Sequence, residues 1–207
     1  MYLRPVFTET DPARIRALIR AHPFGVLVTH GPHGLDASHI PFLLEPAVLE
    51  GGVDGFVLSG HLAAANAQCP ALEGGTALAI FGGPHAYISP SWYEVQPSVP
   101  TWDYAAVHVH GTLMPMTDHS AIITALQGMA ADDPAGFDVS AMPDRYREKM
   151  IAGIRGFILT PTRVEAQWKM SQNRSVTDRQ RVVIALRESA QHDPSATAVA
   201  DLIEQTL

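Results

Sequence analysis

Residues 101–113 form the stretch TWDYAAVHVHGTL. Its side chains alternate between apolar and polar types, which is typical of a β-strand with one buried face. Because side chains two residues apart share a face of a strand, we expect Val107 and Val109 to face the core and His108 and His110 to face away from it. The pattern predicts one long strand near the middle of the chain.

Shorter β-branched and apolar runs, separated by Gly and Pro turns, lie on both sides of this strand. We predict further strands over residues 24–29, 35–44, 56–59, 76–81 and 156–168, with an extended stretch at 85–89. Pro41 has no N–H group to give to a sheet, so it places the second of these runs at an edge or at a bulge.

Helical patterns gather toward the two ends of the chain. Thr10-Asp11-Pro12 begins a helix that ends at Pro23. We predict the other helices over 61–68, 117–130, 143–150, 176–189 and 194–206. Strands that dominate the middle, with helices around them, indicate a mainly β protein of the α+β class. We expect a small barrel with peripheral helices rather than a doubly wound sheet.

The charges are distributed unevenly along the chain. The net charge is −7, and residues 21–144 contain no Lys or Arg but 12 of the 21 acidic residues and nine of the ten histidines. Nucleic acid needs fixed cations, so the central stretch is unsuited to bind it. An anionic cofactor has to be held by the two flanks, by histidines or by backbone N–H groups.

Two sets of residues are candidates for ligand binding. Residues 169–174, KMSQNR, follow a predicted strand and combine Lys169 and Arg174 with the polar side chains of Ser171, Gln172 and Asn173. Such a set can hold a phosphate, although a solvated loop is the simpler interpretation. The second set is aromatic and suits either a planar cofactor or packing in the core and in a dimer. Its members are Trp92, Tyr93, Trp102, Tyr104 and Trp168.

Metal binding and nucleophilic catalysis find little support in the residue pattern. His108 and His110 share a strand face at a spacing that a metal could use, but no third ligand can be identified. No nucleophile elbow, phosphate-binding loop or dinucleotide fingerprint is present. We therefore predict no metal site and no catalytic residues, and an enzyme is the less favoured interpretation.

Several segments together resemble the PaiB-like family of FMN-binding negative transcriptional regulators. The matching segments are MYLRPVF at 1–7, IRAHPFGVLVT at 19–29, ASHIPFLL at 37–44, GHLAAANAQ at 60–68, IFGGPHAYISPSWY at 80–93, VPTWDYAAVHVHG at 99–111 and KMSQNR at 169–174. Their order and spacing span nearly the whole chain.

The resemblance implies a flavin-binding split β-barrel that forms a homodimer with FMN at its interface. The strand with Ser38, His39 and Pro41 resembles the one that contacts the edge of the flavin ring. The following strand-to-helix turn, with Ser59, His61 and Asn66, resembles the site of the phosphate. Trp102 and residues 169–174 complete the expected cofactor-binding set.

One position departs from the family pattern. The family commonly has Arg in a GHLARAN segment, whereas this chain has Ala64 at that place. The substitution removes a cation from the expected phosphate site and weakens the expectation of FMN binding. Phosphate contacts then fall to Lys169, Arg174, His61 and backbone amides.

Alternatives to a flavin-binding regulator stay open. Split barrels also host flavin-dependent oxidoreductases and haem-handling proteins, and the histidines allow a haem or a metal. The charges argue against direct DNA binding, because the last predicted helix has no Lys or Arg and carries Asp201 and Glu204.

The predicted compartment and domain organisation are simple. A single cysteine, Cys69, excludes an internal disulfide, and no apolar run is long enough for a membrane span. With no signal peptide at the N-terminus, we expect a cytoplasmic protein. We predict a split-barrel domain over residues 1–170, with N-terminal and inserted helices, and a helical tail over 171–207 that packs on the same domain.

Overall fold

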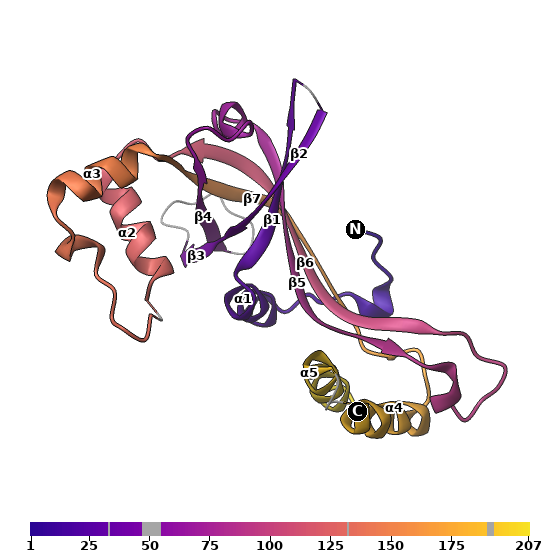
Figure 1. Cartoon of the computed structure of the whole chain (residues 1–207). Helices are drawn as coiled ribbons and strands as arrows, with labels where there is room; N and C mark the ends of the chain where they lie inside the picture. Colours follow the sequence, from indigo (N-terminus) through magenta and orange to yellow (C-terminus); the bar gives the residue numbers. More distant parts are fainter. Residues whose placement is uncertain (33, 47–54, 132, 190–192) are drawn as a thin grey trace. The chain divides into compact units, whose positions relative to one another are not determined.

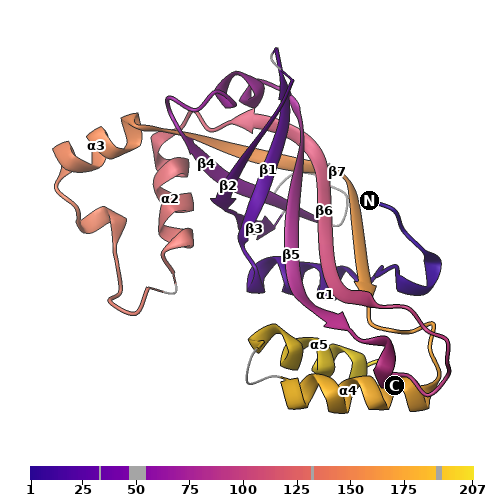
Figure 2. The ribbon, with the colours of Figure 1, turned by 45° about the vertical axis from the view of Figure 1, so that its right-hand side comes forward.

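The structure, a computed structural model, describes residues 1–32, 34–46, 55–131, 133–189 and 193–207. Its seven strands form one sheet in the order β2-β1-β5-β6-β7-β4-β3 (Figure 1). The strands are β1 Phe24–Gly31, β2 Gly34–Pro41, β3 Leu43–Pro46, β4 Phe56–Ala63, β5 Thr76–Ile88, β6 Thr101–Pro115 and β7 Ile154–Lys169. The central strands β5, β6 and β7 are the longest, and they lie side by side (Figure 2).

Five α-helices and four described 3-10 turns accompany the sheet. The α-helices are α1 Pro12–Ala21, α2 His119–Met129, α3 Asp144–Ala152, α4 Val176–Ser189 and α5 Pro194–Glu204. The 3-10 turns are η1 Pro5–Phe7, η3 Cys69–Leu72, η4 Pro90–Trp92 and η5 Val139–Ala141. None of the described helices is long and apolar enough to span a lipid bilayer.

The sheet curls until its two ends meet. Strand β2 is the first in the sheet order and β4 is the last but one, yet the two strands contact each other without being neighbours in the ladder. A sheet closed in this way, with a gap in its backbone pairing, is a split β-barrel. The expected α+β class with a split barrel and peripheral helices is thus confirmed.

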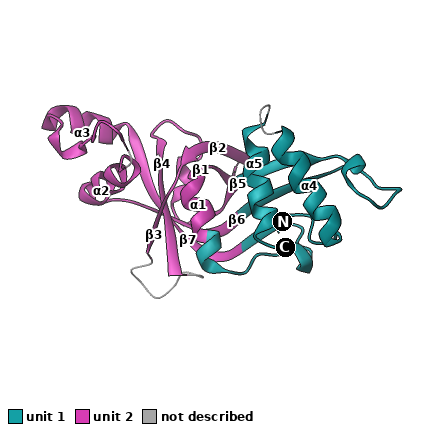
Figure 3. Ribbon diagram, turned by 90° about the horizontal axis from the view of Figure 1, so that it is seen from below, with its two compact units in different colours: residues 1–15, 82–107, 165–207 teal, residues 16–81, 108–164 magenta. Residues whose placement is uncertain are grey.

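The chain divides into two compact units (Figure 3). Unit 1 comprises residues 1–15, 82–107 and 165–207, and unit 2 comprises residues 16–81 and 108–164. The boundaries between the units fall inside α1, β5, β6 and β7. The predicted division at residue 170 does not coincide with these boundaries and stays a prediction.

The core of unit 2 is built on three aromatic rings. Phe42, Phe81 and Phe157 are each at most 3% exposed. The Phe42 ring meets Phe81 edge-on at 5.2 Å between centroids and Phe157 at 6.2 Å. Gly60 lets β4 approach this cluster, since a Cβ atom there would lie 2.8 Å from Cζ of Phe157. The barrel interior is therefore filled by side chains.

The helical part of unit 1 pairs α4 with α5. Val182, Leu186, Val199 and Ile203 are buried between or beneath these helices. The guanidinium of Arg179 donates to the carbonyl oxygens of Ile203, at 3.2 Å, and of Thr206, at 2.9 Å. These bonds satisfy carbonyl groups that the end of α5 leaves without helical partners.

The expected edge position of the second strand is confirmed, but its length is not. β2 is the edge strand next to β1, and it ends at Pro41 instead of continuing to residue 44. Phe42 leaves the ladder, its N–H donates to the carbonyl of Pro23 at 2.9 Å, and its ring enters the core. Pairing resumes in β3, where Leu43 lies opposite Ser59 of β4.

The predicted helix over residues 61–68 is wrong. β4 runs to Ala63, with Ala63 opposite Ile154 of β7, and the N–H of Ala64 then donates to the carbonyl of Gly153 at 2.8 Å. The Ala-rich composition favours a helix only weakly, whereas the ladder with β7 satisfies the same backbone groups and buries alternate side chains. A 3-10 turn begins only at Cys69.

Candidate functional site

The expected ring-contact strand and the turn after β4 come together in unit 2. The side-chain amide of Asn66 donates to Oγ of Ser38 at 2.9 Å. Oδ1 of Asn66 in turn accepts the N–H of Gln68 at 2.8 Å. Two of the predicted site residues, Ser38 and Asn66, are therefore direct neighbours.

The buried side chain of Gln68 fixes the same turn against the β1–β2 hairpin. Its Nε2 lies 3.2 Å from the carbonyl oxygen of Leu27, 2.9 Å from Oγ1 of Thr29 and 3.1 Å from the carbonyl oxygen of Asp36. One amide group thus contacts both strands of the hairpin. The candidate site is built on a rigid part of the barrel, which is what a ligand-binding surface needs.

His39 and Pro41 lie on the exposed face of β2. The burial of β2 alternates, and both residues are on the side that faces away from the core. The His39 ring is stacked with Phe24 of β1 at 6.3 Å between centroids, with 28° between the planes. Phe24 is 66% exposed. Two flat rings beside each other on a sheet face offer an apolar surface to a ligand or a partner.

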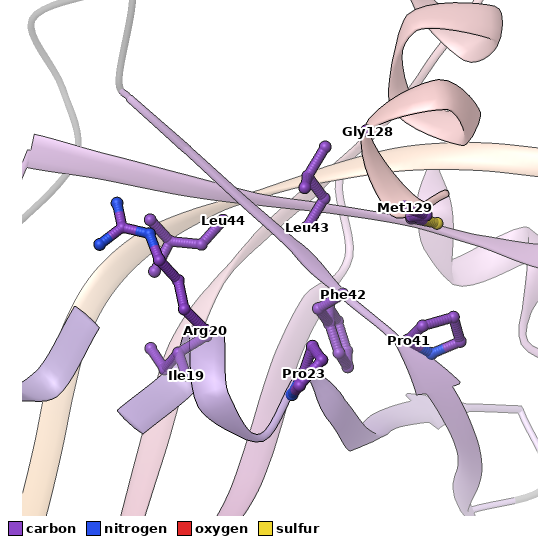
Figure 4. A pocket seen from close by; sticks show the side chains of 9 residues that line it. All are labelled: Ile19, Arg20, Pro23, Pro41, Phe42, Leu43, Leu44, Gly128 and Met129. Atoms are coloured by element: carbon purple, nitrogen blue, oxygen red, sulfur yellow. The ribbon is translucent and has the colours of Figure 1, made fainter. Parts of the chain in front are cut away.

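An apolar cleft of about 180 Å³ opens beside Pro41 (Figure 4). Arg20 at the end of α1 is the one charged side chain in its lining, and the other lining residues are apolar. They are Ile19, Pro23, Pro41, Phe42, Leu43, Leu44, Gly128 and Met129. The close approach of α2 to β3 depends on Gly128, since a Cβ atom there would lie 2.6 Å from Cδ2 of Leu43. The break between β2 and β3 is therefore one of the places where the surface of this unit is hollowed; a second hollow, of about 500 Å³, lies over β1, β5 and β6 and includes His110 and Arg163.

Ser59 is already engaged inside the unit. It is fully buried on β4, and its hydroxyl donates to Oε1 of Glu45 on β3. With the predicted helix replaced by strand, the expected phosphate site has neither a helix N-terminus nor the cation that Ala64 replaces. The turn after β4 is therefore poorly equipped to hold a phosphate.

His61 lies on β4 in an apolar surrounding. A small cavity beside it is lined by Met116 and Ile154 together with Ile122, Ala125 and Met129 of α2. Burial lowers the pKa of His61 below its usual value of 6.5. The imidazole is neutral at pH 7, so it offers a hydrogen bond to a ligand but no positive charge.

This environment leads to a prediction for the titration of His61. We expect its NMR titration midpoint to lie below 6.5, because the unfolded chain holds the proton more tightly than the folded one. The contribution of His61 to stability is then complete above pH 6.5 and is lost as the pH falls through the folded pKa. A midpoint for His61 at or above 6.5 would contradict the burial described here.

The predicted phosphate ligands of unit 1 surround a buried carboxylate instead. Nζ of Lys169 lies 3.2 Å from Oδ1 of Asp103 and 2.7 Å from Oγ1 of Thr101, and it also donates to the carbonyl of Trp102. Ser171 donates to Oδ2 of Asp103 at 2.6 Å. Burial raises the pKa of Asp103, while the bond from Ser171 and the charge of Lys169 oppose that rise.

The rest of the segment after β7 is also tied to its own unit. Gln172 accepts the N–H of Met170 at 2.7 Å and donates to the carbonyl of Trp168 at 2.6 Å. The guanidinium of Arg174 lies over the Tyr93 ring, 4.0 Å from its centroid. Asn173 is exposed. The segment therefore contributes to the internal structure of unit 1.

The aromatic set divides between the core and the surface of unit 1. Tyr93 and Trp168 are buried, at 3% and 5% exposure. Trp102 is 53% exposed and contacts Tyr87 edge-on at 5.9 Å and His85 at 6.2 Å. Among the predicted site residues of this unit, Trp102 presents an apolar surface to the outside.

Sequence reasoning missed Asp103 and Arg20. Asp103 occupies an inward position of the alternating strand, in line with Ala105, Val107 and Val109. A carboxylate at such a position signals a buried partner. One feature of the sequence could have pointed to Arg20: it is the last cation before residues 21–144, which contain no Lys or Arg.

A flavin, the cofactor implied by the resemblance, can be tested against these residues. An apolar cavity of about 150 Å³ holds a benzene molecule, so the cleft beside Pro41 has room for one ring of a flavin rather than for all three. Its lining is apolar, as a dimethylbenzene edge requires, and Arg20 borders it with a positive charge. The residues of unit 2 fit the ring edge and offer a cation for an anionic tail.

Comparison with known proteins identifies the family of the chain. Residues 1–163 match the model of a family described as "Putative FMN-binding domain". Protease synthase and sporulation protein PAI 2 of Bacillus subtilis is 30% identical over 213 residues, covering 100% of this chain and 98% of that protein.

Solved structures show the same fold at low sequence identity. A FAD and heme binding protein from Mycobacterium smegmatis superposes with a TM-score of 0.57 at 13% identity, over 78% of this chain and 73% of that one. A flavocytochrome from Azotobacter vinelandii gives a TM-score of 0.58 at 11% identity, over 81% and 72%. The fold, the full-length relative and the family match agree, and the chain belongs to the PaiB-like family of FMN-binding split-barrel proteins.

Proposed function

We propose that this protein binds FMN as a cytoplasmic homodimer and acts as a flavin-responsive negative transcriptional regulator. The observation that carries the proposal is the coincidence of two features at one place. The family match includes the segment ASHIPFLL at 37–44, which contains the break between β2 and β3. The apolar cleft opens within that segment, at Pro41, Phe42, Leu43 and Leu44.

The proposed site assigns different tasks to different residues. Pro41 and the apolar wall behind it hold an edge of the flavin ring and exclude water from it. Ser38 and Asn66, already joined by a hydrogen bond, supply polar groups beside the strand. When bound, the flavin supplies electron-transfer chemistry that the amino-acid side chains lack.

Regulation in this proposal does not require direct contact with DNA. In the α4–α5 pair, where a DNA-reading helix would be sought, two of the three cations, Arg179 and Arg187, are engaged, and only Arg181 is exposed without a partner among the described residues. Arg187 contacts Asp201 at 2.9 Å and Glu204 at 2.8 Å, and Arg179 is buried. Helix α5 thus carries acidic groups in place of phosphate ligands. We therefore propose that the protein reaches a promoter through a protein partner.

Exposed rings support the homodimer. Trp102 and Tyr87 form an exposed aromatic pair on unit 1, and Phe24 is exposed on unit 2. Large aromatic side chains in water favour association because their burial removes apolar area from solvent. A second copy of the chain is the partner that the resemblance implies.

A fluorescence titration tests the proposal. We expect the purified protein to quench flavin fluorescence with half-saturation at or below tens of micromolar FMN. Leu44→Trp, which places a larger side chain in the cleft, should weaken binding about tenfold or more. The matched control is Val176→Trp, at a position 54% exposed on α4. Absence of quenching by the unaltered protein at tens of micromolar would refute flavin binding.

A further inference from the structure

Arg20 is placed to act on a ligand at the cleft. It lies in the last turn of α1 and is exposed to solvent. Figure 4 shows its side chain at the border of the cleft, with the guanidinium extended beyond Ile19 toward Leu44. Within the part of the chain that the structure describes, no hydrogen bond or ion pair engages this guanidinium.

Three other cations of unit 2 are committed to their own surroundings. Arg147 pairs with Asp144 at 2.5 Å and also donates to two backbone carbonyls. Arg155 donates to the carbonyls of Ala152 and Ile154. Arg163 contacts the His110 ring at 3.1 Å. None of these side chains lines the cleft.

The expected phosphate site offers no replacement for them. Ala64 provides no charge, and burial keeps His61 neutral at pH 7. The hydroxyl of Ser59 donates a hydrogen bond to Glu45. A phosphate held near the β3–β4 pair therefore needs a cation from another element. Helix α1 supplies one, because Arg20 lines the same cleft as Leu43. Leu43 is the ladder partner of Ser59, so the cleft adjoins the expected phosphate site.

We infer that Arg20 binds the phosphate of FMN and thereby determines whether this protein distinguishes FMN from riboflavin. The inference rests on the proposed flavin site and deepens it. The guanidinium is planar and offers two parallel N–H groups to phosphate oxygens. The apolar wall of the cleft receives the ring edge, which FMN and riboflavin share. Recognition of the ring and of the phosphate is thus divided between different residues.

The test compares two ligands and three proteins by isothermal titration calorimetry. The ligands are FMN and riboflavin, and the proteins are the unaltered chain, Arg20→Gln and Arg145→Gln. Arg145 is an exposed cation of α3 outside the cleft, so its substitution removes the same charge elsewhere in unit 2. Arg20 is exposed as well, so neither substitution opens a cavity in the core.

We expect the unaltered protein to bind FMN at least tenfold more tightly than riboflavin. Arg20→Gln should weaken FMN binding by about tenfold to a hundredfold, the loss of one charge-assisted contact, and leave riboflavin binding unchanged. Arg145→Gln should alter neither affinity by more than about twofold, since a remote exposed charge is screened by salt.

The outcomes separate this inference from the function on which it rests. Equal weakening of both ligands by Arg20→Gln would show that Arg20 acts on the ring or on the fold, and it would overturn the inference. Equal affinity of the unaltered protein for FMN and riboflavin would overturn it too, while leaving flavin binding intact. Failure of the unaltered protein to bind either ligand would refute the proposed function itself.

Discussion

Replacing Phe157 by Ala lowers the free energy of unfolding by about 3–5 kcal/mol, the largest loss that we expect from a single substitution here. Phe157 is fully buried in unit 2, meets the Phe42 ring edge-on, and fills the space left by Gly60. Its truncation leaves a cavity that these rigid strands cannot close. Urea unfolding followed by circular dichroism measures the change.

Two comparison variants make this result specific. Phe157→Leu should cost less, about 1–2 kcal/mol, because it retains part of the buried volume. Phe137→Ala removes the same side chain at a position 42% exposed in the same unit, and it should change stability by no more than about 0.5 kcal/mol. Similar losses for Phe157→Ala and Phe137→Ala would mean that the aromatic cluster does not hold the barrel together.

Replacing Asp103 by Ala should destabilise the protein by about 2–4 kcal/mol. The Asp103 side chain has no exposed surface, and it accepts bonds from both Lys169 and Ser171. Removing one partner of a buried charged pair leaves the other without compensation, although partial exposure of Lys169 reduces that penalty. Asp103→Asn keeps one oxygen acceptor and should cost only about 1–2 kcal/mol.

The raised pKa of Asp103 gives this comparison a pH dependence. Because the folded state holds the proton more tightly than the unfolded chain, the contribution of Asp103 to stability is greatest below 3.8 and falls as the pH rises through the folded pKa. Asn at this position does not titrate. The stability of the unaltered protein relative to Asp103→Asn should therefore decrease across that window. A difference that increases with pH would contradict the dominant effect of burial on this pKa.

Local patterns predicted the elements in which backbone preference and burial agree. The helix over residues 176–189 is found with the same bounds, and the alternation in 101–113 places Val107 and Val109 in the core, both fully buried. Pro41 correctly indicated an edge. In each case, the residues of one continuous stretch are enough to predict the element.

Contacts between distant segments determine the features of the fold and of the candidate site that local patterns could not predict. The Ala-rich stretch 61–68 has helical composition, but β7, more than 90 residues later, pairs with β4 up to Ala63. The cations after β7 looked available for a phosphate, yet the partner of Lys169 is Asp103, 66 residues away. The cleft beside Arg20 is likewise built from α1, the β2–β3 break and α2, and no single motif describes it.

The bonds that join the β1–β2 hairpin to the turn after β4 also affect the order of folding. Asn66 and Gln68 reach residues between 28 and 41 positions away in the sequence. Each such bond can form only after a long loop of chain has closed, and the entropy of loop closure makes non-local contacts slow to form. These loops are shorter than the more than 90 residues that separate the paired strands β4 and β7, so the hairpin and the turn after β4 can join before β7 closes the barrel.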